Sequence, residues 1–128
     1  MYPTLSQAPL PDFDFTDEER RGVYLPDEDS FLLMDAAKTL LERNPDFSPR
    51  SVLEVGPGSG VVITSVLQTL KNLGKPAERY GAFDLNPLAV GMTRKTLKSA
   101  GFAENCVLGD LKSIPPKDAP SEPSDPRI

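Results

Sequence analysis

Three alternating glycines in Glu54-Val-Gly56-Pro-Gly58-Ser-Gly60 constrain the fold of this chain more than any other feature of its sequence. They follow directly on Ser51-Val-Leu-Glu-Val55, a short apolar run that is typical of a buried strand. After the glycines, apolar residues recur at helical spacing, at Val61, Val62, Val66, Leu67, Leu70 and Leu73. The sequence therefore predicts a strand, a tight turn and a helix that ends near Gly74.

The same order of elements repeats further along the chain. Residues 79–83 predict a second strand ending at Asp84, and Asn86-Pro87 predicts the N-cap and first turn of a helix to about Ala100. Residues 105–108 predict a third strand. Strands that alternate with helices form parallel sheets with right-handed crossovers, so we expect an α/β fold. More strands would be expected beside the outer edge of the third strand, because that edge is unpaired.

A further helix is predicted ahead of the first strand, starting at Asp29 or Ser30 and ending before Asn44-Pro45. Its apolar residues follow a period of 3.6 and would form the buried face: Phe31, Leu33, Met34, Ala37, Leu40 and Leu41. Ser30 is at least as good a candidate for the N-cap of this helix as for a ligand contact, and it could serve as both.

The two ends of the chain differ in composition from its middle. Eight of the 14 prolines lie in residues 1–20 and 112–128, and few apolar residues accompany them. We therefore expect residues 1–20 to be a flexible N-terminal segment, residues 21–111 to form one partial domain and residues 112–128 to be a disordered proline-rich tail. A complete open α/β sheet needs roughly 150 to 250 residues, which also indicates a partial fold.

Charge and composition argue against several classes of function. A net charge of −5 disfavours direct electrostatic binding of nucleic acid, which needs clustered lysine and arginine. Without histidine and with Cys106 as the single cysteine, the common zinc ligand sets are out of reach, so we expect no metal site. Cys106 is most simply a buried strand residue. No signal peptide or membrane span is predicted, so the cytosol or nucleus is the expected compartment.

The spacing of the glycines indicates which ligand the turn would accept. A dinucleotide fingerprint has the pattern Gly-x-Gly-x-x-Gly, but Val61 stands where its last glycine would be. Glu54 would also repel a pyrophosphate, whereas a carboxylate suits the ammonium group of an amino-acid ligand. S-adenosylmethionine (SAM) carries that ammonium group and a sulfonium. Gly56, Gly58 and Gly60 would let such a cofactor approach the backbone closely.

Two further carboxylates follow the next two predicted strands. Asp84 lies 24 residues after Gly60, where a carboxylate can accept hydrogen bonds from both ribose hydroxyls of a nucleoside. Asp110 could accept from the adenine amine with Leu111 against the ring, although it could equally be an ordinary turn residue at a strand end. Three acids at three successive strand ends favour a SAM site more strongly than any one of them does.

Four segments within residues 22–111 together resemble the HemK-like SAM-dependent methyltransferases. They are Val23-Tyr-Leu-Pro-Asp-Glu-Asp-Ser-Phe-Leu-Leu33, Glu54-Val-Gly-Pro-Gly-Ser-Gly-Val-Val62, Phe83-Asp-Leu-Asn-Pro-Leu-Ala89 and Gly109-Asp-Leu111. The first segment discriminates, because many methyltransferases share the glycine motif and the acids. The resemblance is strongest to the eukaryotic and archaeal branch that methylates a glutamine of a translation release factor. It implies the N-terminal half of a Rossmann-like class I methyltransferase fold.

The resemblance also implies specific roles and partners. The implied cofactor contacts are Ser30, Glu54, Gly56, Asp84, Asp110 and Leu111, with Tyr24 and Pro26 helping to close the site. The implied partners are a release factor as substrate and a small zinc-binding activator subunit. The family's catalytic signature, Asn-Pro-Pro-Tyr, is absent, because Ile114-Pro-Pro-Lys117 lacks the asparagine and the aromatic residue and Leu88 follows Asn86-Pro87. No residue is therefore assigned a catalytic role.

From the resemblance we expect a glutamine N5-methyltransferase, or a truncated isoform or fragment of one that retains the cofactor-binding half. Two alternatives remain open. One is a methyltransferase for another acceptor, such as a protein lysine or a nucleobase amine. The other is a non-enzymatic protein that binds SAM or the activator subunit.

Overall fold

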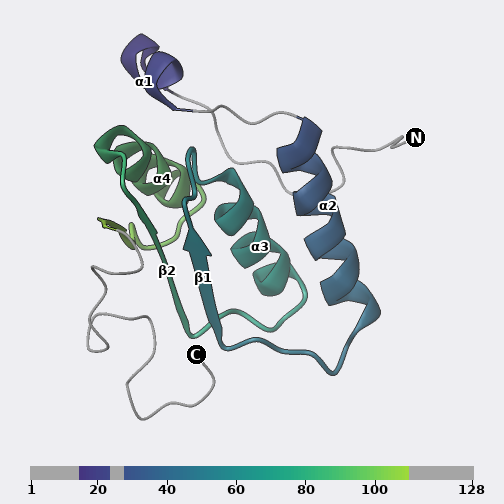
Figure 1. Cartoon of the computed structure of the whole chain (residues 1–128). Coiled ribbons are helices and arrows are strands. Elements are labelled where there is room, and N and C mark those ends of the chain that lie inside the picture. The colour runs from purple at the N-terminus through teal and green to yellow at the C-terminus, as the bar shows by residue number, and fades with distance from the viewer. Residues whose placement is uncertain (1–14, 24–27, 110–128) are drawn as a thin grey trace.

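The computed structural model describes residues 15–23 and 28–109, in which three strands form one parallel sheet in the order β1-β2-β3 (Figure 1). The elements follow one another as α1 (Asp17–Gly22), α2 (Glu28–Arg43), β1 (Ser51–Val55), α3 (Val61–Asn72), β2 (Arg79–Asp84), α4 (Pro87–Ser99) and β3 (Cys106–Leu108). The predicted α/β fold class, with three parallel strands and flanking helices, is confirmed.

The core lies between the sheet and the two helices that connect its strands. Residues of α3, α4, β2 and β3 pack there, in a cluster of Ile63, Leu67, Ala82, Val90, Leu97 and Cys106, and Val52 of β1 packs against it. Both crossovers run in the same direction along the sheet, so right-handed connections place α3 and α4 on the same face. Helix α2 lies beside α3 (Figure 1) and buries Met34 against Val61.

The opposite face of the sheet is apolar and open to solvent at several positions. Leu53, Val55 and Val107 are 38%, 55% and 54% exposed, and their register places them on the face away from Val52 and Ala82. Doubly wound sheets have the strand order 3-2-1-4-5-6, so a fourth strand would pair with β1. The prediction that further strands join at β3 is not tested by the three described strands, whose order leaves β1 and β3 at the two edges of the sheet.

Two helix ends follow the sequence signals closely. The Asn86 side chain accepts a hydrogen bond of 3.0 Å from the Leu88 N–H, and Pro87 opens α4, as predicted. Gly74, which follows the C-cap residue Leu73 of α3, adopts φ of +76°, and the Lys75 N–H donates to the Leu70 carbonyl, which closes the helix. The elements that position the glycine turn are thus bounded by strong local signals.

Helix α2 and strand β3 differ in detail from the prediction. Helix α2 begins at Glu28, so Ser30 lies inside its first turn and is not the N-cap. Leu33 and Leu40 were predicted to be buried but are 54% and 56% exposed. Because α2 packs mainly on α3 among the described elements, it buries only the narrow stripe that contains Met34 and Leu41. Strand β3 begins one residue later than predicted.

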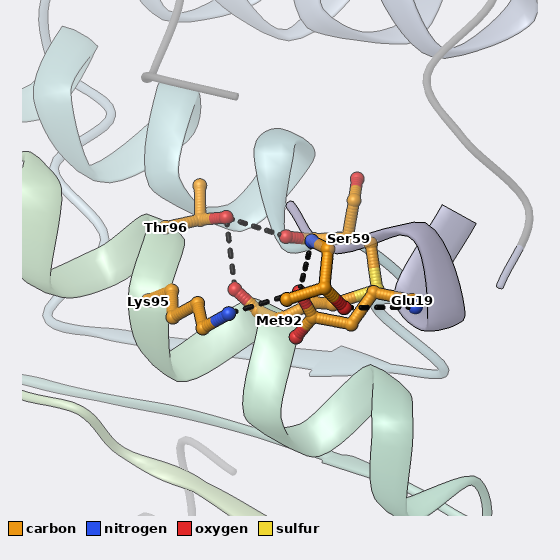
Figure 2. Close-up of polar contacts among 6 residues, drawn as sticks. Glu19, Ser59, Met92, Lys95 and Thr96 are labelled. Atoms are coloured by element: carbon orange, nitrogen blue, oxygen red, sulfur yellow. Dashed lines mark hydrogen bonds and ion pairs between the residues drawn. The ribbon is translucent and has the colours of Figure 1, made fainter. Parts of the chain in front are cut away.

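Helix α1 (Asp17–Gly22) overlaps the last residues of the segment 1–20, which was predicted to be flexible. Thr16 and Glu19 form a reciprocal capping box, which satisfies backbone N–H groups at the start of the helix. Glu19 also lies 2.9 Å from the Lys95 ammonium group on α4 (Figure 2), and the Asn86 side-chain amide donates to the Gly22 carbonyl. The folded part therefore starts before residue 20, because α1 has a partner surface on α4. Residues 1–14 and 112–128 lie outside the described residues.

We expect Lys95→Met to lower the free energy of unfolding by about 1 kcal/mol, because the buried Glu19 carboxylate would lose its cationic partner. The effect stays small because the Lys95 side chain is half exposed. Urea denaturation measures the change. Lys98→Met is the matched control, since Lys98 is exposed on the same helix. Equal losses in the two variants would show that the ion pair with α1 contributes nothing.

None of the described helices is long and apolar enough to cross a membrane.

Candidate functional site

The glycine turn joins β1 to α3 at the carboxyl ends of the strands. Gly56, Gly58 and Gly60 adopt φ values of +67°, +59° and +86°, in the left-handed region that other residues rarely occupy. At Gly60 a Cβ would also lie 2.8 Å from the Cα of Thr93 on α4. Glycine is thus required at this position both for its dihedral angle and for close packing of the turn on α4.

The Glu54 side chain lies beneath this turn, against the start of α3. One of its carboxylate oxygens accepts a hydrogen bond of 3.1 Å from the Ile63 N–H. The N-cap residue Gly60 has no side chain to cap the helix, so Glu54 supplies the acceptor and the negative charge that the helix start favours. The Ile63 bond uses one of the two carboxylate oxygens.

Burial raises the pKa of Glu54 from 4.5 to about 7. The Ile63 hydrogen bond opposes this shift, and the negative charge of Asp84 adds to it. The two carboxylates therefore lie close enough to repel each other across the ends of β1 and β2. A site with this charge pattern favours a cationic group.

Asp84, at the end of β2, is oriented by two backbone groups. Its Oδ2 accepts from the Gly58 N–H at 3.2 Å, and its Oδ1 accepts from the Asn86 N–H at 2.9 Å. The first bond joins residues that are 26 positions apart and ties the β2 carboxylate directly to the glycine turn. Glu54, Asp84 and the three glycines therefore lie together at the carboxyl ends of β1 and β2.

Two threonines on α4 hold the turn from below, and sequence reasoning missed both. Thr93 Oγ1 donates to the Gly58 carbonyl at 3.1 Å, and Thr96 Oγ1 donates to the Ser59 carbonyl at 2.7 Å (Figure 2 shows Thr96). Their side chains are buried, on the face of α4 that the apolar pattern assigns to the core. Polar residues at i and i+3 on a buried helix face were the available signal, because buried hydroxyls need partners.

The remaining predicted site residues stand apart from this cluster or outside the described part of the chain. The Ser30 N–H donates to the Asp29 carboxylate, and no hydrogen bond among the described residues links Ser30 to the turn. Asp110, Leu111, Tyr24 and Pro26 lie outside the described residues. The Cys106 side chain is buried, and burial raises the pKa of its thiol to about 11, as suits an inert core residue. Among the described residues, no cluster of three or more aspartate, glutamate, cysteine or histidine side chains could hold a metal ion.

Comparison with solved structures places this arrangement among known folds. The chain aligns with a candidate RNA methyltransferase from Pyrococcus horikoshii at a TM-score of 0.52 and 20% identity, over 87% of this chain and 50% of that one. The fold of this chain therefore matches about half of the Pyrococcus horikoshii protein. No protein-family model matches the sequence, and no curated protein matches it.

Two other structures are similar at a lower score. The ribosomal protein L11 methylase of Lactobacillus delbrueckii subsp. bulgaricus has a TM-score of 0.49 and 17% identity, over 67% of this chain and 39% of that one. A methyltransferase-like protein of Burkholderia thailandensis, solved with S-adenosylhomocysteine, has a TM-score of 0.49 and 24% identity, over 68% of this chain and 22% of that one. The chain spans half or less of the length of each of these three proteins.

Proposed function

We propose that this chain binds SAM at the carboxyl ends of β1 and β2 and forms the cofactor-binding half of a methyltransferase. The observation that carries the proposal is the hydrogen bond from the Gly58 N–H to Asp84, which joins the glycine turn and the β2 carboxylate in one site. Ligands of open α/β sheets bind at this end of the strands. The fold shared with a candidate RNA methyltransferase supports the same assignment.

Each carboxylate has a distinct role in the proposed complex. Asp84 accepts hydrogen bonds from the ribose 2′ and 3′ hydroxyls of SAM, and Glu54 attracts the ammonium group, directly or through water. The glycines leave room for the ligand beside the backbone. Ser30, Asp110 and Leu111 complete the site in the proposal, as the family resemblance implies.

The finer proposal is a glutamine N5-methyltransferase of the HemK-like release-factor branch, working with a small zinc-binding activator subunit. The segment Val23 to Leu33 supports it, because this pattern separates the branch from other methyltransferases. An amide nitrogen is a poor nucleophile and needs groups that orient it, a contribution of several kcal/mol. The sequence carries no Asn-Pro-Pro-Tyr to supply them, so we expect binding of SAM without appreciable turnover from these 128 residues.

Isothermal titration calorimetry with SAM tests the cofactor proposal. We expect saturable binding, and a rise in melting temperature when SAM is present, because a ligand that binds only the folded state stabilises it. ATP is the matched control ligand, since its triphosphate would meet the two carboxylates unfavourably. Absence of heat and of a thermal shift with SAM would reject the proposed function.

Transfer of a labelled methyl group tests the finer proposal. The chain is incubated with SAM, release factor and the activator subunit, and we expect no label above background on the release-factor glutamine. Efficient labelling would show that the chain carries its own acceptor site and would contradict the cofactor-half proposal. Labelling of a lysine or a nucleobase instead would assign a different acceptor.

A further inference from the structure

Helix α4 holds the glycine turn through a buried hydroxyl whose position suggests more than packing. The Thr93 side chain is 0% exposed, and its Oγ1 donates to the Gly58 carbonyl at 3.1 Å. The two residues are 35 positions apart, so this bond joins two separate elements of the fold. Burying a hydroxyl costs free energy unless the hydroxyl is hydrogen-bonded, and the Gly58 carbonyl accepts a hydrogen bond from the Thr93 hydroxyl.

Gly58 is thereby fixed on both sides of its Cα. On one side its N–H donates to Asp84 Oδ2 at 3.2 Å, and on the other side its carbonyl accepts from Thr93. Gly58 adopts φ of +59°, and glycine has more backbone freedom than any other residue. Two fixed neighbouring peptide groups remove that freedom at the residue whose N–H orients the Asp84 carboxylate.

We infer that Thr93 is a positioning residue of the cofactor site, acting on Asp84 through Gly58. Its hydroxyl sets the dihedral angles of Gly58, and the Gly58 N–H then holds Asp84 Oδ2 in the orientation that suits the ribose hydroxyls. The inference rests on the proposed SAM site and assigns it a residue that would not itself touch the ligand. Preorganisation of this kind raises affinity because the ordering of the loop precedes binding.

The structure also separates the hydroxyl of Thr93 from its methyl group. The methyl group lies against Gly60, where a Cβ on that glycine would be 3.0 Å from Thr93 Cγ2. Packing of the turn on α4 therefore depends on the methyl group, whereas control of Gly58 depends on the hydroxyl. Thr93→Val keeps the shape and removes the hydroxyl, and Thr93→Ser keeps the hydroxyl and removes the methyl group.

The test measures SAM affinity by calorimetry and the Gly58 amide signal by ¹H–¹⁵N NMR in the full chain. We expect Thr93→Val to weaken SAM binding about 10-fold, as for loss of one hydrogen bond that orders the site, and Thr93→Ser to stay within about twofold of the wild type. In Thr93→Val without ligand, the Gly58 amide should exchange faster with solvent. Thr69→Val is the control, because Thr69 is buried on α3 and the substitution removes a hydroxyl outside the glycine turn.

A purely structural role would produce a different pattern. Thr93→Val would then lower the melting temperature and leave both the SAM affinity and the exchange of the Gly58 amide unchanged. An unchanged SAM affinity overturns the inference, and so does an unchanged exchange rate of the Gly58 amide. Failure of Thr93→Ser to retain affinity would also overturn it, since packing would be the cause. If Thr93→Val does not fold, Thr93→Ala replaces it, and equal affinities of Thr93→Ala and Thr93→Ser would count against the hydroxyl. The amide measurement needs no ligand, so it tests the Gly58 link even if the wild type fails to bind SAM.

Discussion

Replacement of Asp84 by alanine is expected to weaken SAM binding by about 100-fold or more, the loss expected for two hydrogen bonds to a charged group. Asp84 would accept from both ribose hydroxyls in the proposed complex. Its oxygens already orient the Gly58 and Asn86 N–H groups, so the substitution removes both the ligand contact and the link between β2 and the glycine turn. Calorimetry with SAM measures the affinity directly.

Two variants make the Asp84 result specific. Asp84→Asn keeps the shape and one acceptor oxygen, and we expect an affinity between those of the wild type and Asp84→Ala. Asp46→Ala removes an exposed carboxylate in the segment before β1 and should leave binding unchanged. Unaltered SAM affinity in a folded Asp84→Ala protein would show that Asp84 does not bind the ribose hydroxyls. A far-ultraviolet circular dichroism spectrum like that of the wild type establishes the folding.

Elements with strong local signals could be predicted from the sequence. The β1 strand, the glycine turn and α4 with its Asn86 cap each follow from a pattern that neighbouring residues determine, namely an apolar run, alternating glycines and an Asn-Pro pair. The closeness of Glu54 and Asp84 was also predictable, since the carboxyl ends of adjacent parallel strands meet at one edge of a sheet.

Features that depend on partners distant in the sequence could not be predicted. The acidic, proline-rich start concealed α1, which is held by Lys95 and Asn86 on α4. Leu33 and Leu40 fit a helical period, but periodicity does not reveal that α2 packs mainly on a single helix, α3, among the described elements. The role of Glu54 at the start of α3 likewise required the structure, because nine residues separate Glu54 from Ile63.

Replacement of Glu54 by glutamine is expected to stabilise the protein without ligand and to weaken SAM binding. Burial raises the pKa of Glu54 to about 7, above the value of 4.5 for a free side chain. The folded state therefore binds this proton more tightly than the unfolded state does. The stability that this tighter proton binding gives the folded state is fully present below pH 4.5 and is lost as the pH rises through about 7.

The loss of stability from this group between pH 4 and pH 8 is about 3 kcal/mol, as a shift of that size implies. Glutamine keeps an oxygen that can accept from the Ile63 N–H and has no charge to lose. We thus expect Glu54→Gln to be more stable than the wild type at pH 8 by about 1 to 3 kcal/mol and to show no such advantage at pH 4. Urea denaturation at both values measures the difference, with Glu104→Gln as an exposed control.

Proton release connects this carboxyl group to the ligand. If the SAM ammonium group binds near Glu54, it favours the ionised form of the carboxyl group. Binding near pH 6 should then release about 0.9 proton, because the pKa of Glu54 in the folded protein without ligand is about 7. Calorimetry in buffers with different ionisation enthalpies counts this proton. Glu54→Gln should release none and should bind SAM about 10-fold more weakly, because the ammonium group loses its charged partner. Equal proton release in both proteins would assign the proton to another group and leave Glu54 with only its role at the start of α3.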